Sequence, residues 1–243
     1  MTPSPEEHPI DEATAQSSLL QKCDMLAIKA AFLGFLLQLA GSSFANSLKN
    51  PFLAYVIIPC QGICSIFILL AGYFIGHRAT AVPWSQLIPR ATTRPLSRLV
   101  FIISFAIASF ILVTTFNLMV VYIFRINPGH QSQFLIDAFK NGGWAIRLIL
   151  LVEVCLAAPV FEELAFRLAI PRWLSSKGFS GFCSSLITSL LFGLFHFIWW
   201  GIPGLFLFSM ILCHVRQQQD IFSCFAVHSL YNFLIAVTAT MTT

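Results

Sequence analysis

Charged side chains are scarce in this sequence. Only 10% of its 243 residues are charged, whereas 57% are hydrophobic, and soluble globular proteins carry about a quarter charged residues. So few charges cannot cover the water-facing surface of a soluble domain, which predicts an integral membrane protein. The net charge of +4 needs no nucleic-acid partner, because basic loops beside a lipid bilayer account for it.

The sequence also lacks the usual patterns of a disulfide framework, a zinc finger or a cleaved leader. Its seven cysteines are scattered, mostly within apolar runs, without a CxxC pair, so we interpret them as small core residues. Residues 1–24 are polar and lack the basic-then-apolar order of a signal peptide. We expect them to form a short surface or disordered segment, followed by a single membrane domain over residues 25–243.

Long apolar runs fill the remainder of the chain. A membrane-spanning helix needs about 20 apolar residues, and candidate spans lie at residues 25–46, 52–76, 98–124, 146–170, 179–199, 203–215 and 219–240. Pro159 and Pro171 are expected to divide the fourth span into two helical pieces, because proline removes a backbone donor. The sequence therefore predicts an all-α, polytopic transmembrane helical bundle with seven to eight spans.

The distribution of basic residues between the loops predicts the orientation. With seven spans and an inner N-terminus, the inner side holds Lys22, Arg78, Arg90, Arg94, Arg98, Arg172, Lys177 and Arg216. The outer side holds Lys49, Arg125, Lys140 and Arg147. Loops rich in Lys and Arg stay on the cytoplasmic side, so we predict a cytoplasmic N-terminus.

Ionisable residues within spans are costly and usually face a cavity or a partner. Glu163 and Arg167 are four positions apart, which places them on one helix face and predicts an ion pair with a structural role. Glu162 points about 100° away from Glu163, and no polar residue lies three or four positions from it. It therefore needs water or a polar group on another helix. Glu153 is interpreted as a structural residue that bonds a neighbouring helix or lines a cavity.

Two later spans offer such polar groups. His196 lies in an apolar segment, one turn after Phe192, and His228 and Asn232 share a face four positions apart. A single buried histidine is usually a core residue, and a single asparagine often joins helices. Three helices that each offer such groups, beside a carboxylate without a local partner, instead predict a site.

These residues form three motifs in a fixed order. EELAFR (162–167) fits EExxxR, FGLFH (192–196) fits FxxxH, and HSLYN (228–232) fits HxxxN. On successive spans, they resemble the CPBP family, which comprises the type II CAAX prenyl endopeptidases and bacterial relatives linked to bacteriocin processing and self-immunity, also called the Abi family. The resemblance implies an intramembrane endopeptidase that hydrolyses a peptide bond of a peptide or a prenylated protein.

The resemblance also implies a role for each motif residue. Glu162 would activate water as the general base, assisted by His196, and His228 and Asn232 would stabilise the oxyanion. Glu163, Arg167 and Phe192 would support the site. These roles suit amide hydrolysis, which needs a base for the water proton and donors for the negative charge. Ser229 and Cys155 lie near the motif residues in the sequence, but neither occupies a motif-defining position, which disfavours a serine or cysteine protease.

The sequence leaves a zinc-dependent version of the same protease open. Glu162, His196 and His228 would supply three ligands, with water at the fourth position. There is no HExxH motif, and asparagine is a poor zinc ligand but a good donor. Because members of the family are also described as metal-independent glutamate enzymes, we favour a site without a cofactor.

Two functions of other classes compete with hydrolysis. The chain would be a membrane scaffold or immunity protein if partner binding were the purpose of the motifs. It would be a small transporter if the buried carboxylates and histidines relayed protons, although the spans show no inverted repeat. Under the hydrolase hypothesis we expect four side chains, those of Glu162, His196, His228 and Asn232, to converge on one cavity.

Overall fold

The computed structural model describes residues 9–47, 51–87, 95–126, 139–140 and 142–241. Every regular element among these residues is a helix, and no strand occurs among them. The predicted all-α bundle is therefore confirmed. Five helices of the described residues are long and apolar enough to cross a membrane, namely Thr14–Gly41, Cys60–Thr80, Pro95–Phe124, Trp144–Ser176 and Ile221–Thr238.

The structure describes the following helices along the chain. Their bounds are α1 (Pro9–Ser47), α2 (Pro51–Thr80), α3 (Trp84–Leu87), α4 (Pro95–Phe124), α6 (Trp144–Val152), η2 (Glu153–Ala157), α7 (Ala158–Glu163), η3 (Leu164–Ala169), α8 (Ile170–Ser176), α9 (Gly181–Phe195), α10 (Ile202–Gln218) and α11 (Ile221–Met241). Helices α9 and α10, with 15 and 17 residues, correspond to the predicted spans 179–199 and 203–215. Both are shorter than the roughly 20 residues that a full crossing needs.

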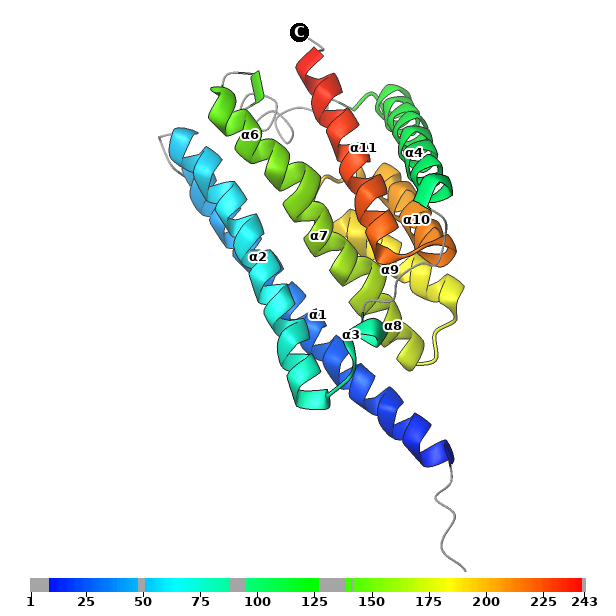
Figure 1. The fold of residues 1–243 in the computed structure, drawn as a ribbon. Coiled ribbons are helices and arrows are strands. Elements are labelled where there is room, and N and C mark those ends of the chain that lie inside the picture. Colours follow the sequence, from blue (N-terminus) through cyan, green and yellow to red (C-terminus); the bar gives the residue numbers. More distant parts are fainter. Residues whose placement is uncertain (1–8, 48–50, 88–94, 127–138, 141, 242–243) are drawn as a thin grey trace, which may run out of the picture.

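Three layers are visible in the bundle. Helices α1 and α2 lie side by side along one flank, and α6 to α8 run as one continuous helix through the middle (Figure 1). Helices α4, α9, α10 and α11 cover the other side of this middle helix. The main core of buried apolar side chains lies where these layers meet. The middle helix, which carries the EExxxR motif, therefore contacts both flanks.

Helix α1 begins earlier than predicted. The described part of the polar segment 1–24 forms its first turns from Pro9 onward, so this part is helical rather than disordered. Proline is tolerated at a helix start, and the following run of Ala, Glu, Gln and Leu has high helix propensity. Asp24, at the end of this segment, is only 2% exposed and forms an ion pair with Arg172 of α8.

The prediction that two prolines break the fourth span is wrong. The middle helix runs from Trp144 to Ser176 through two π-helical stretches, η2 and η3. In η2 the Ala158 N–H bonds to the Glu153 carbonyl five residues earlier. In this wider register Pro159, which has no N–H, leaves the Val154 carbonyl without a partner from its own helix. The Asn232 amide donates to that carbonyl at 2.8 Å. The wider turns and the side-chain donor keep the helix continuous.

The start of α11 is fixed against α4. Asp220 precedes the helix, and its carboxylate accepts from the Ser223 backbone N–H at 2.8 Å, as an N-cap does. The same carboxylate pairs with Arg98 of α4 at 2.5 Å. Because His228 lies two turns beyond this cap, the contact helps to position the polar face of α11.

Candidate active site

A cluster of ionisable side chains lies between the middle helix and α11. His228 is 3% exposed, and its Nδ1 lies 2.8 Å from Glu163 Oε1. Its Nε2 lies 3.7 Å from Glu162 Oε2. Because a carboxylate accepts hydrogen bonds, the Nδ1 atom carries the proton in the contact with Glu163. His228 therefore bridges two adjacent carboxylates of α7 and directs Nε2 toward Glu162.

The expected ion pair between Glu163 and Arg167 is present. Arg167 Nε lies 3.3 Å from Glu163 Oε2, and both side chains are fully buried. The guanidinium also lies over the Phe192 ring, 5.0 Å from its centroid. The same ring contacts His196 and His228, with centroid separations of 4.7 and 6.0 Å. Phe192 thus packs against the cation and both imidazoles.

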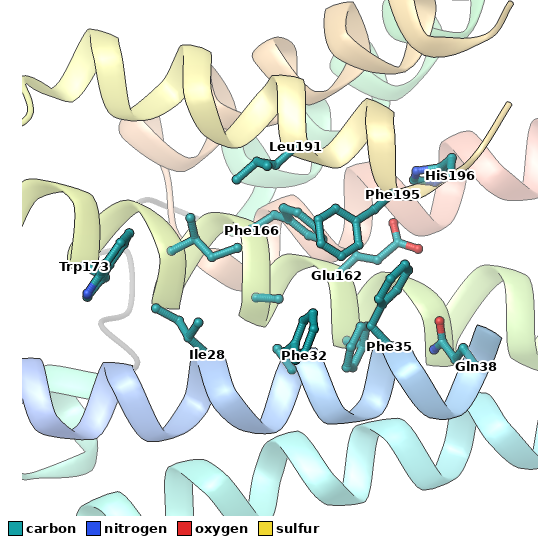
Figure 2. Close-up of a pocket in the computed structure, with 14 residues that line it drawn as sticks. Ile28, Phe32, Phe35, Gln38, Glu162, Phe166, Trp173, Leu191, Phe195 and His196 are labelled. Carbon is teal, nitrogen blue, oxygen red and sulfur yellow. The ribbon is translucent and has the colours of Figure 1, made fainter. Parts of the chain in front are cut away.

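Glu162 faces a cavity rather than the packed core. Its side chain is 19% exposed, and it lines a cavity of about 370 Å³ together with His196. Figure 2 shows the carboxylate and the imidazole at the same end of this cavity. The His196 Nδ1 lies 2.7 Å from the Phe192 carbonyl. Because a carbonyl accepts hydrogen bonds, Nδ1 carries the proton and donates to it, so the Nε2 atom is left as an acceptor. Glu162 has thus found polar neighbours on two other helices.

Asn232 lies one turn after His228 on α11, as the HxxxN spacing requires. One of its N–H groups donates to the Val154 carbonyl that Pro159 leaves without a helical donor. A primary amide has a second N–H. The structure therefore gives Asn232 an interhelical bond, and only the remaining N–H is available for another acceptor.

Several polar atoms of the cluster have hydrogen-bonding capacity that the described residues do not use. Glu162 Oε2 and the two terminal guanidinium nitrogens of Arg167, Nη1 and Nη2, are buried without a hydrogen-bond partner among the described residues. Buried polar groups are rarely left unpaired in proteins. This unused capacity is a reason to regard the cluster as a site for water or a polar substrate group.

Most of the cavity wall was not anticipated from the sequence. Helix α1 supplies Phe32, Phe35 and Gln38, and Trp173 of α8 lies at the far end (Figure 2). The Phe35 ring meets the Phe195 ring edge-on, at a centroid distance of 4.3 Å. Apolar residues in a membrane span carry no sequence signal that separates a cavity wall from a lipid-facing surface. Only Gln38, a polar residue within a span, could have attracted attention.

Glu153 does not line this cavity. Its carboxylate packs against Gly62 of α2 so closely that a Cβ on Gly62 would lie 1.7 Å from Oε1. Glycine at position 62 therefore makes room for a carboxylate between two helices. This position fits the expected contact with a neighbouring helix.

The three residues considered for zinc do not form a metal-ligand group. Among the residues that the structure describes, no set of three or more His, Cys, Asp or Glu side chains is arranged to hold a metal ion.

The region that holds these side chains is similar to a known protein family. The family model described as type II CAAX prenyl endopeptidase Rce1-like matches residues 143–234. This part of the chain is therefore similar to the Rce1-like family. No curated protein and no solved structure matches the chain.

The Rce1-like region covers the helices from α6 to most of α11 and contains all three motifs. The five apolar helices support an integral membrane protein, and similarity to a CAAX-protease family implies a protein or peptide as substrate. Helices α1 and α2 lie outside the match, although α1 contributes one wall of the cavity.

Proposed function

We propose that the protein is an intramembrane endopeptidase in which Glu162 activates water for attack on a peptide carbonyl. One observation carries this proposal: the Glu162 carboxylate stands at the polar end of an otherwise apolar cavity, beside His196 and 3.7 Å from His228. A base must lie within reach of the water that it deprotonates. The cavity offers space for that water and for the substrate.

Each proton has a place in this scheme. Glu162 takes one proton from water, while the water oxygen forms a bond to the carbonyl carbon. His196 accepts a hydrogen bond from the same water through its free Nε2. When the C–N bond breaks, Glu162 returns the proton to the leaving amine. In this scheme the carboxylate alone carries the proton from the water to the leaving amine.

The hydrogen-bond donors that stabilise the oxyanion come from α11. The Nδ1–H of His228 donates a hydrogen bond to Glu163. A donor to the oxyanion must therefore be Nε2, which carries a second proton when the ring is an imidazolium. Glu163 and Arg167 then have structural and electrostatic roles: the first orients the ring, and the second offsets the charge of the adjacent carboxylates. The second N–H of Asn232 supplies another donor. Each such donor contributes about 3–4 kcal/mol where water is excluded.

The mechanism is tested with Glu162→Gln and His228→Ala in purified protein. The substrate is a prenylated CaaX peptide, and cleavage is followed by mass spectrometry. Loss of the general base is expected to lower kcat by a factor of about 100 or more. Glu153→Gln is the matched control, because this carboxylate lies on the same helix but does not line the cavity. Undiminished cleavage by both site variants would refute the mechanism, and a cellular phenotype that both retain would favour a scaffold.

Metal dependence is tested separately. The proposed glutamate enzyme retains its activity after chelation and contains no stoichiometric zinc by elemental analysis. Activity lost with a chelator and restored by zinc would favour the metalloprotease version.

We also infer a cytoplasmic N-terminus from the distribution of basic residues. A reporter that is active only in the cytoplasm, fused before residue 1, tests this orientation. Activity only of a reporter that requires export would reverse it.

A further inference from the structure

The cavity has one polar end and a long apolar body. Glu162, His196 and Gln38 lie toward one end, and Trp173 lies at the other (Figure 2). Trp173 follows Glu162 by 11 positions (173 − 162) on the continuous middle helix. At a rise of 1.5 Å per residue, this spacing corresponds to about 16 Å. The cavity is therefore elongated along the helix axis.

The walls between the two ends suit a hydrocarbon chain better than a peptide. They come from three helices and are apolar, with Phe32 on α1, Phe166 and Ile170 on the middle helix, and Leu191 on α9. A peptide placed there would bury its N–H and C=O groups without partners, at a cost of several kcal/mol for each group in an apolar medium. A hydrocarbon chain has no such groups and gains from burial in proportion to its area.

An ion pair lies next to the end of the cavity that Trp173 lines. Arg172, the residue before Trp173, forms an ion pair with Asp24 of α1, whose side chain is 3% exposed. The pair joins α1 to α8, the two helices that flank this end of the cavity. Separating these helices would break this ion pair, in which Asp24 is buried. The pair thus helps to hold α1 and α8 together at this end of the cavity.

We propose that Trp173 determines the length of the hydrocarbon chain that the enzyme accepts on its substrate. The chain enters with its attachment point near Glu162 and extends toward α8, where the indole ring stops it. A longer chain requires the indole to move or the attachment point to withdraw from Glu162. This inference rests on the proposed function, which places the scissile bond at Glu162, but it is measured by binding rather than by hydrolysis.

The experiment uses the inactive Glu162→Gln protein in phosphatidylcholine nanodiscs. The probes are N-acetylcysteine carrying S-geranyl, S-farnesyl or S-geranylgeranyl groups, and the Kd of each is measured. Adding Trp173→Ala lengthens the cavity, so the affinity for the longest chain relative to the shorter ones rises about tenfold or more, since even one methylene changes selectivity by that order. Ile28→Phe, on the facing helix near Trp173 (Figure 2), narrows the same end and shifts the preference toward shorter chains.

The matched control is Trp144→Ala, because Trp144 is 80% exposed and lies outside the cavity. Its ratios of Kd match those of the parent protein. A second readout uses a farnesyl probe with a diazirine at the chain terminus, which is expected to label the peptide that contains Ile170 and Trp173. Trp173→Leu is the milder substitution to use if the alanine variant is poorly folded.

The proposal is wrong if the ratios of Kd stay constant in both the Trp173 and the Ile28 variants. Labelling confined to the lipid-facing surface of α4 would also overturn it. Absence of peptide cleavage by the unmutated enzyme would instead count against the proposed function. The two failures are therefore distinguishable.

Discussion

The two walls of the cavity are built on different principles. The wall formed by the middle helix carries Glu162 and lies beside a network of buried charges, in which His228, Glu163 and Arg167 contact one another in series. The wall formed by α1 is apolar apart from Gln38. The first wall is thus suited to chemistry, and the second to holding an apolar group.

The walls also differ in how they are stabilised. Behind the first wall, Glu163 and Arg167 are fully buried and neutralise each other. The contact between α1 and α8 includes an ion pair whose arginine keeps 22% exposure. A charge that reaches solvent tolerates loss of its partner better than one that is enclosed. We therefore expect substitutions in the first wall to lower the free energy of unfolding more than substitutions in the second wall.

The largest effect on stability is expected from Glu163→Gln. It leaves Arg167 fully buried without its counter-charge, which costs about 3–5 kcal/mol. Asp24→Asn is the counterpart on α1, and its cost is smaller because Arg172 can turn to water. Unfolding free energies from denaturant titration in micelles compare the two variants. Equal losses would remove the distinction between the two walls.

A smaller effect is expected at the contact between α2 and the middle helix. Gly62→Ala places a methyl group where the Glu153 carboxylate lies, and such overpacking costs about 1–3 kcal/mol. Glu153→Ala removes the clashing atoms, so Gly62→Ala is expected to be nearly neutral in that background. The same titration measures this double-mutant cycle. Additive losses would mean that the two residues do not share the space.

The sequence predicted the chemical wall far better than the apolar one. Ionisable residues in a membrane span are costly, so Glu162, Glu163, Arg167, His196 and His228 stood out, and the pair between positions 163 and 167 was correctly predicted. Phe32 and Phe35 of the apolar wall, and Trp173 at the end of the middle helix, were missed because a Phe or Trp in a span is equally suited to lipid. The continuous path of the middle helix was missed for another reason. A π-helical turn and a bond from α11 compensate for Pro159, and neither is visible in the local pattern.

Removal of one aromatic ring from the apolar wall tests whether that wall contributes to substrate binding or to the chemical step. Phe35→Ala enlarges the cavity near Glu162 without touching the charge network. We expect KM to rise by about tenfold or more, since the loss of one apolar contact is worth about 1–3 kcal/mol, while kcat stays nearly constant. Steady-state kinetics on the prenylated peptide separate the two constants. A fall in kcat with unchanged KM would place Phe35 in the chemical step instead.

The smallest effect separates the structural contribution of Asn232 from its proposed part in catalysis. Asn232→Leu removes the donor to the Val154 carbonyl, and interhelical hydrogen bonds in membranes are worth about 0.6 kcal/mol on average. Pro159→Ala supplies a backbone N–H to the same helical segment, so Asn232→Leu is expected to cost less stability in that background. Activity should not recover together with stability, because the alanine amide replaces the bond to Val154 but not a donor to the oxyanion. Recovery of both would reduce Asn232 to an interhelical contact and leave His228 as the donor from α11.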